Sequence, residues 1–140
     1  MKVFIKGNVP SSKNSKIKGR FFSPTVQKYL RSHGIKSFSS RRKEVEFYKT
    51  IECTFPVTEL QELLKNVKYP VIIGFHFIRG TKHKWDFHNA CQILLDVFTA
   101  FDIIQDDDMT HIIPQCLWIE GNHYSYDKSN PGVIIQIINY

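Results

Sequence analysis

Acidic and imidazole side chains flank one apolar segment in the second half of this 140-residue chain. Asp86 and His88 precede the segment, and Asp106, Asp107 and Asp108 follow it. A small cluster of carboxylates can bind one or two Mg²⁺ ions, which activate water and offset the charge of a phosphodiester during hydrolysis. The same residues also have ordinary structural interpretations: Asp86 as a helix cap, His88 as a surface histidine and the three aspartates as a solvated turn. The residue types alone leave both interpretations open.

The segment between these residues has the period of a helix about three to four turns long. We predict that Asn89 caps this helix together with Gln92. The chain from Asp86 to His88 would then be extended, with both of these side chains on the same side, as suits two ligands of one metal ion. A helix of this length spans about 20 Å, so the aspartates after it must fold back to reach Asp86 or meet the site of a second subunit. The apolar stripe consists of Ala90, Ile93, Leu94, Val97, Phe98 and Phe101.

Basic residues are concentrated in the first third of the chain. Residues 1–43 contain twelve Lys or Arg and no Asp or Glu, although the net charge of the whole chain is only +6. This separation of charge favours a polyanionic partner such as a nucleic acid, whose phosphates are bound largely through Lys and Arg. A solvated basic surface is the alternative. The residues that we predict to contact DNA are Lys13, Lys16, Lys18, Arg20, Arg41, Arg42, Lys82 and Lys84.

Aromatic residues lie among these cations. Phe21, Phe22 and Tyr29 could stack on unpaired bases while the neighbouring cations hold phosphates. They could equally pack into the core, as the aromatic residues of an ordinary loop do. Exposure of these three rings would favour a nuclease that acts on RNA or on single strands.

The periodicity of the sequence predicts strands and helices separated by polar connections. No regular element is predicted between residues 13 and 40, and residues 121–131 are predicted to be a polar connection. Thr58 is the expected cap of the second helix, and Pro114 indicates that its strand lies at an edge of the sheet or contains a bulge. The predicted strands cover residues 2–6, 69–78, 111–119 and 132–139, and the predicted helices other than the central one cover about 41–54 and 58–64.

This order of elements predicts one α+β domain over residues 1–140, with the basic loop region 10–43 included. In this fold class helices pack on a mixed β-sheet. The apolar side chains of the last strand, Val133, Ile135 and Ile137, could form a contact between two subunits, although a place in the core is the stronger expectation.

The composition is typical of a globular protein, with 42% hydrophobic and 23% charged residues. No apolar run is long enough to span a bilayer, and residues 3–5 are too short for a signal peptide because Lys6 interrupts them. Cys53, Cys91 and Cys116 lack the spacing of metal ligands and indicate reduced, buried thiols. These features predict a cytoplasmic protein without a membrane partner.

The residues around the central helix resemble the RusA family of Holliday-junction resolvases, which are small, often phage-encoded endonucleases. The resemblance lies in an Asp-x-x-Asn sequence at Asp86 and Asn89, an aspartate seven residues after that asparagine, and the pair Asp106-Asp107 ten residues further on. The order of elements is also similar, including the N-terminal strand, the segment Pro10-Ser11-Ser12-Lys13-Asn14 and the basic stretch after it.

This resemblance implies a RusA-like fold and a homodimer that binds four-way DNA junctions and nicks two strands symmetrically with Mg²⁺ or Mn²⁺. Carried over by position, Asp86 matches the first metal-binding aspartate of the family. Asp107 matches the catalytic aspartate after the helix, with Asp106 as its neighbour, and Asn89 matches the asparagine at the helix start. The protein would be bacterial or phage-encoded and cytoplasmic.

Two positions depart from the family pattern. The second aspartate of the family is His88 here, and its lysine in the first helical turn is Gln92. An imidazole ligand shifts the metal preference toward Mn²⁺ or another transition ion. Loss of the lysine removes a cation that could hold the scissile phosphate, a role that Lys82 or Lys84 could take instead.

The sequence therefore predicts a metal-dependent endodeoxyribonuclease that resolves Holliday junctions by paired nicks. The alternative is a catalytically impaired protein of the same fold that binds DNA junctions. In the first interpretation the catalytic residues are Asp86, His88 and Asp107, and the metal ligands are these three and Asp106, with Asp108 as a further assisting residue.

Overall fold

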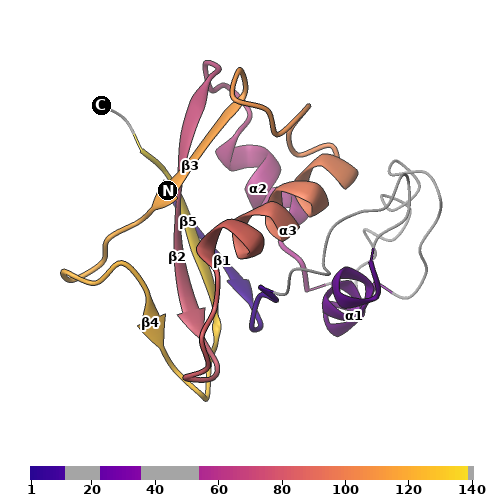
Figure 1. Ribbon diagram of the computed structural model, residues 1–140. Coiled ribbons are helices and arrows are strands. Elements are labelled where there is room, and N and C mark those ends of the chain that lie inside the picture. Colours follow the sequence, from indigo (N-terminus) through magenta and orange to yellow (C-terminus); the bar gives the residue numbers. More distant parts are fainter. Residues whose placement is uncertain (12–22, 36–53, 139–140) are drawn as a thin grey trace.

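The computed structural model describes residues 1–11, 23–35 and 54–138 (Figure 1). These residues form three helices and one five-stranded mixed sheet, which confirms the predicted α+β class. In chain order the elements are β1 (Lys2–Lys6), α1 (Pro24–Ser32), α2 (Val57–Leu63), β2 (Val71–Arg79), α3 (Phe87–Ala100), β3 (Ile112–Cys116), β4 (Ser125–Tyr126) and β5 (Gly132–Ile138). Apart from Thr54, the predicted helix over 41–54 lies outside the described residues, as do Lys13, Lys16, Lys18, Arg20, Phe21, Phe22, Arg41, Arg42 and Cys53.

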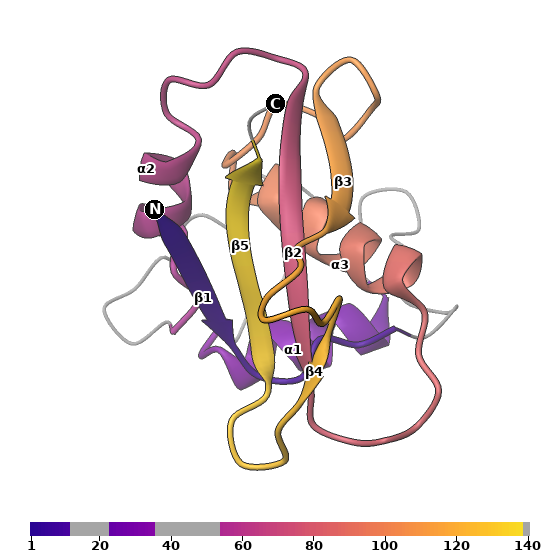
Figure 2. The same ribbon diagram turned by 90° about the vertical axis from the view of Figure 1, so that its left-hand side faces the viewer.

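The predicted central strand, β2, lies in the middle of the sheet. The strand order is β1-β5-β2-β3, and β4 pairs with the last two residues of β2. β5 runs antiparallel to both β1 and β2, whereas β3 and β4 run parallel to β2. Figure 1 shows the sheet from its edge with the three helices on one side, and Figure 2 shows the opposite face.

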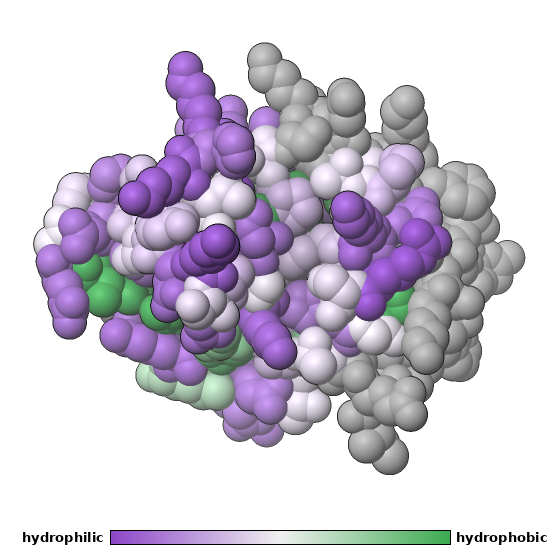
Figure 3. All heavy atoms as spheres, turned by 90° about the horizontal axis from the view of Figure 1, so that it is seen from below, coloured by the Kyte–Doolittle hydropathy of each residue, from purple (hydrophilic) through white to green (hydrophobic). Residues whose placement is uncertain are grey.

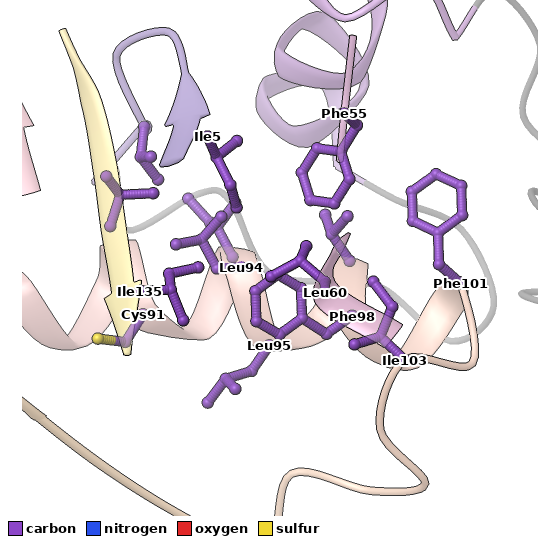
Figure 4. Packing of buried hydrophobic residues seen from close by; sticks show 14 of the residues in the cluster. Ile5, Phe55, Leu60, Cys91, Leu94, Leu95, Phe98, Phe101, Ile103 and Ile135 are labelled. Atoms are coloured by element: carbon purple, nitrogen blue, oxygen red, sulfur yellow. The ribbon is translucent and has the colours of Figure 1, made fainter. Parts of the chain in front are cut away.

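The core lies between the sheet and the helices. β1 alternates between exposed and buried residues, as expected for a strand with one face on the core. The apolar stripe predicted for α3 is buried, and Leu94 and Phe98 lie among Ile5, Leu60 and Ile135 (Figure 4). Burial of this stripe fixes the side of α3 that faces the sheet and leaves its polar side outward.

The strands β3 and β5 form where the sequence predicted strands, and their burial tests the roles that were proposed for them. β3 lies at the edge of the sheet, as Pro114 predicted. In β5, Val133 and Ile135 are fully buried, which confirms the core role for these two residues and excludes them from a subunit contact. Ile137 is partly buried and packs against the core.

The prediction of an irregular chain between residues 13 and 40 is wrong, because this stretch contains α1. Ser23 caps this helix, accepting a hydrogen bond from the Val26 amide at 3.3 Å, and Pro24 is the first helical residue. Tyr29 on the buried side of α1 is 4% exposed, which excludes it as a stacking platform for a base.

Two further boundaries differ from the prediction. α2 begins at Val57, with Pro56 rather than Thr58 in the capping position and no side-chain cap. The connection predicted over residues 121–131 contains the short strand β4, which reaches the free part of the β2 edge beyond β3. Two residues of strand are too few to show a period in the sequence.

No helix among the described residues has the length and apolar character needed to cross a membrane. Cys91 on α3 is buried, as predicted, and its burial raises the pKa of the thiol. Cys116 at the end of β3 is only partly buried.

His76 on β2 holds the segment that leaves the sheet between β3 and β4. Its ring is 1% exposed, with Nδ1 2.8 Å from the carbonyl oxygen of Leu117 and Nε2 2.7 Å from the hydroxyl of Ser125. A carbonyl oxygen only accepts, so Nδ1 donates to Leu117, and Nε2 shares the second hydrogen bond with the Ser125 hydroxyl. One ring therefore holds both ends of the segment 117–125.

We predict that His76→Leu lowers the free energy of unfolding by about 2 kcal/mol, because it removes both hydrogen bonds from a buried position. Ser125→Ala removes one of them and should cost about 1 kcal/mol. Chemical denaturation measures both values, with His123→Leu at an exposed position as the control. Equal losses for His76→Leu and His123→Leu would show that His76 does not fix the segment.

Candidate functional site

Asp86, not Asn89, caps α3. Its backbone is extended, and its Oδ1 accepts hydrogen bonds from the amides of His88 at 2.8 Å and Asn89 at 3.2 Å. The helix begins earlier than predicted because Phe87 packs on the core, with its ring 5.6 Å from the ring of Phe77. A carboxylate also suits the positive end of the helix dipole. The structural interpretation of Asp86 as a cap is therefore correct, and among the described residues the capping hydrogen bonds involve only Oδ1 of its carboxylate.

His88 lies in the first turn of α3 and is exposed. The predicted extended pair, with Asp86 and His88 on one side of a strand, is wrong because Phe87 and His88 are already helical. The ring of His88 lies 5.8 Å from that of Phe87, at nearly a right angle.

Asn89 connects the start of α3 to the N-terminal part of the chain. Its Nδ2 donates to the carbonyl oxygen of Ser11 at 3.2 Å. Ser11 follows β1 and directly precedes the basic stretch of the sequence. The chain therefore enters that stretch beside the helix end that carries Asp86.

Gln92 links an aspartate of α3 to an aspartate of the connection after it. Its Nε2 donates to Oδ1 of Asp96 at 2.9 Å and to Oδ2 of Asp107 at 2.8 Å. The predicted alternatives were a fold-back to Asp86 within one chain or a meeting across two subunits. Asp107 does fold back beside the helix within one chain, but the residue that it reaches is Gln92. Gln92 is the sixth residue of α3, so Asp107 approaches the helix roughly 9 Å along its axis from Asp86.

Five polar side chains therefore lie at α3. Four belong to the helix or its cap, and one belongs to the connection that follows the helix. We call this set the α3 polar face. Asp96 is the only buried carboxylate among the described residues, at 8% exposure. The α3 polar face comprises Asp86, Asn89, Gln92, Asp96 and Asp107.

The other two aspartates of the triple form turns. Oδ1 of Asp106 accepts from the Asp107 amide at 2.7 Å. Oδ1 of Asp108 accepts from the hydroxyl and amide of Thr110 and lies 2.9 Å from Nδ1 of His111. The Thr110 hydroxyl, followed by His111, lowers the pKa of Asp108 to about 2. Asp108 is therefore an ionised turn residue, as the solvated-turn interpretation held, and Asp106 is exposed beside Asp107.

Of the basic residues at the end of β2 and in the connection after it, only some are available to a ligand. Lys82 and Lys84 are exposed, and the Lys82 ammonium lies 5.0 Å from the centre of the Tyr126 ring. Arg79 is buried, donates to the carbonyl oxygen of Val9 at 2.6 Å and lies 4.8 Å from the Trp85 ring centre. Burial lowers the pKa of Arg79, and its guanidinium is a structural group.

The donor chemistry of the α3 polar face suits a hard divalent cation. Within the described residues, no group of three His, Cys, Asp or Glu side chains is placed to hold a metal ion. Mg²⁺ requires less, since it is commonly bound by one or two carboxylates together with water and substrate phosphates. The Gln92 amide nitrogen already lies between two carboxylate oxygens, as a cation would. The carboxylate oxygens of Asp86 and Asp107 are of the kind that Mg²⁺ prefers, whereas the two carboxylates that Gln92 brings together are those of Asp96 and Asp107.

No protein-family model, curated protein or solved structure matches this chain. The resemblance to the RusA family accordingly rests on the residues from Asp86 to Asp107 and the order of elements.

Asp96, which carried no predicted role beyond its place in the family resemblance, bonds to Gln92 on the α3 polar face. Two signals mark it in the sequence. An aspartate interrupts the otherwise apolar run Ile93 to Phe98, and it follows Gln92 by four residues, the spacing at which helical side chains meet.

We predict that Asp86→Ala lowers the free energy of unfolding by about 1 kcal/mol, because the helix loses its cap. Asp86→Asn should stay within about 0.5 kcal/mol of the unmodified protein, since asparagine caps as well as aspartate. Thermal or chemical denaturation distinguishes the two. A loss in Asp86→Asn as large as that in Asp86→Ala would mean that the charge, not the cap, stabilises the helix.

We predict that Gln92→Leu lowers the free energy of unfolding by about 1–2 kcal/mol and releases the segment around Asp107 from α3. Faster amide hydrogen exchange over residues 102–108 would report the release. Gln61→Leu makes the same change at a partly exposed position of α2 and should leave this exchange unchanged. Unchanged exchange in Gln92→Leu would contradict the role of Gln92.

Proposed function

We propose that this protein is a metal-dependent endonuclease that binds branched DNA and resolves four-way junctions by paired nicks. The observation that carries the proposal is the contact of Gln92 with both Asp96 and Asp107. It brings Asp107, from the connection after the helix, beside Asp96 on α3 within a single chain. The basic N-terminal third of the sequence adds the charge expected of a protein that binds phosphates.

In this proposal each residue of the α3 polar face has a defined task. Asp86, through Oδ2, and Asp107 hold Mg²⁺ or Mn²⁺, with Asp106 beside them. When bound, the ion activates water and offsets the charge that develops on the phosphate. Gln92 and Asp96 keep Asp107 against the helix.

Residues around the α3 polar face complete the proposed site. His88, in the first turn of α3, is a further ligand for a transition ion. Lys82 and Lys84 contact phosphates of the strand to be cut. Paired nicks need two sites, so a homodimer is part of the proposal, with one site in each subunit.

A catalytically impaired junction-binding protein is the second candidate. Gln92 favours it, because the position of the family's lysine is taken by a neutral amide whose Nε2 donates to Asp96 and Asp107. Such an amide cannot offset the charge of a scissile phosphate. The two candidates predict the same binding of junctions and differ only in cleavage.

We predict that the protein cleaves four-way junctions faster with Mn²⁺ than with Mg²⁺, because imidazole suits transition ions better than Mg²⁺. His88→Asp should raise cleavage with Mg²⁺, since it adds a negatively charged oxygen ligand. Cleavage of a labelled junction with each ion, followed on a denaturing gel, measures both effects. If His88→Asp changes neither the rate nor the metal preference, His88 is not a ligand.

The same assay tests Asp86. Asp86→Asn should abolish cleavage with either ion, by at least about 100-fold, and leave junction binding largely intact, because asparagine keeps the cap but loses the charge. Asp102→Asn, an exposed aspartate beyond the far end of α3, is the matched control and should cleave normally. Absence of cleavage in both the native protein and His88→Asp, with junction binding retained, would replace the endonuclease by the junction-binding protein.

A further inference from the structure

A separate hollow of about 390 Å³ lies where the connection between β2 and α3 meets the segment before β4. None of its lining residues belongs to the α3 polar face. At the end of the molecule where β2 finishes, the described surface is mostly hydrophilic, with only small hydrophobic areas (Figure 3). The lining of this hollow includes Lys82, His83, Lys84, Trp85, His123 and Tyr124.

Aromatic rings form one wall of the hollow and continue beyond it. Tyr124 lies 5.2 Å from Trp85 and 5.0 Å from His123, centre to centre. Trp118 extends this row, 5.3 Å from His123. Tyr124 is 39% exposed and Trp118 is 64% exposed. The row therefore offers aromatic surface to a flat ligand.

Basic side chains also line the hollow. Lys82, His83 and Lys84 are consecutive and exposed, and none of the described residues that line the hollow is acidic. The combination of exposed rings with cations is suited to a group that is flat at one end and anionic at the other. A nucleotide has this chemistry, because bases stack on aromatic side chains while cations hold the phosphates.

The walls are held in place by contacts behind them. His76 fixes both ends of the segment that carries Trp118, His123 and Tyr124. The buried Arg79 guanidinium lies against the Trp85 ring. A preformed site of this kind loses less conformational entropy on binding than a mobile loop would.

We propose that this hollow binds one unstacked nucleobase of a DNA strand, together with its neighbouring phosphate. The inference rests on the proposed function in one respect, that the strand belongs to branched DNA. Trp85 lines the hollow and Asp86 belongs to the α3 polar face, so a base held here lies close to the proposed scissile phosphate. Bases at a branch point are the ones most easily unstacked, and binding one would select branched over continuous duplex DNA.

Intrinsic fluorescence offers a direct test, because the only two tryptophans of the chain are Trp85, which lines the hollow, and Trp118, which extends its aromatic row. Titration with a short oligothymidylate, in EDTA, should quench this fluorescence. Tyr124→Leu should weaken the binding about tenfold or more, since it removes a stacking surface but keeps an apolar side chain. Tyr69→Leu, at a tyrosine of similar exposure (43%) beyond the other end of β2, is the matched control and should bind normally.

A second variant tests the basic side chains of the hollow. Lys84→Gln should weaken the binding. A plot of the logarithm of the binding constant against the logarithm of the salt concentration should also become less steep, by about the slope of one phosphate contact. Equal affinity of the native protein and Tyr124→Leu would overturn the proposal. So would quenching by inorganic phosphate alone, which would indicate an anion site. Binding of thymidine monophosphate as tightly as the oligonucleotide would assign the hollow to free nucleotides and also overturn it.

The oligonucleotide is unbranched and no metal is present, so this test is independent of cleavage. Quenching that depends on Tyr124, in a protein that cuts no junction with Mn²⁺, would leave the base site standing and remove the endonuclease. Junction cleavage in a protein whose oligonucleotide binding is unaffected by Tyr124→Leu would leave the endonuclease standing and remove the base site.

Discussion

The hydrogen bonds along the two edges of β2 are the constraint on which the arrangement of the molecule depends. β5 occupies one edge, while β3 and β4 share the other, with β3 on the first half and β4 on the last two residues. The chain must leave the sheet between them, and His76 holds that excursion at both ends. This change of partner along one strand edge places His123 and Tyr124, two of the rings that line the hollow, on the excursion between β3 and β4.

Parallel pairing of β2 with β3 also determines the course of α3. The chain has to cross from the end of β2 to the start of β3, and a helix usually makes that crossing. The connection after α3, from Phe101 to His111, is longer than the two to six residues that are common for such connections. Its length allows it to return along the helix, where Asp107 meets Gln92. Two carboxylates approach closely there because an amide donor lies between them.

The two proposed sites have opposite charge and adjoin in the sequence at Trp85 and Asp86. The α3 polar face supplies carboxylates, which suit a divalent cation, whereas the hollow supplies lysines and rings, which suit a nucleotide. A polyanion near bare carboxylates is repelled unless cations offset them. In the proposed function the metal ion and the lysines together make the region attractive to a phosphate.

Local periodicity in the sequence determined the central strand β2 and the buried stripe of α3, because each depends on neighbours within one element. The order of these elements gave the α+β class, and Pro114 gave the edge position of β3. Residue type and the resemblance to the RusA family marked Asp86 and Asp107 as residues of interest. The tertiary structure decided which residue caps α3, since both Asp86 and Asn89 can act as caps and the packing of Phe87 on Phe77 favours the earlier start. It alone decided that Asp107 returns to Gln92 within one chain, because a hydrogen bond between residues fifteen positions apart leaves no period in the sequence.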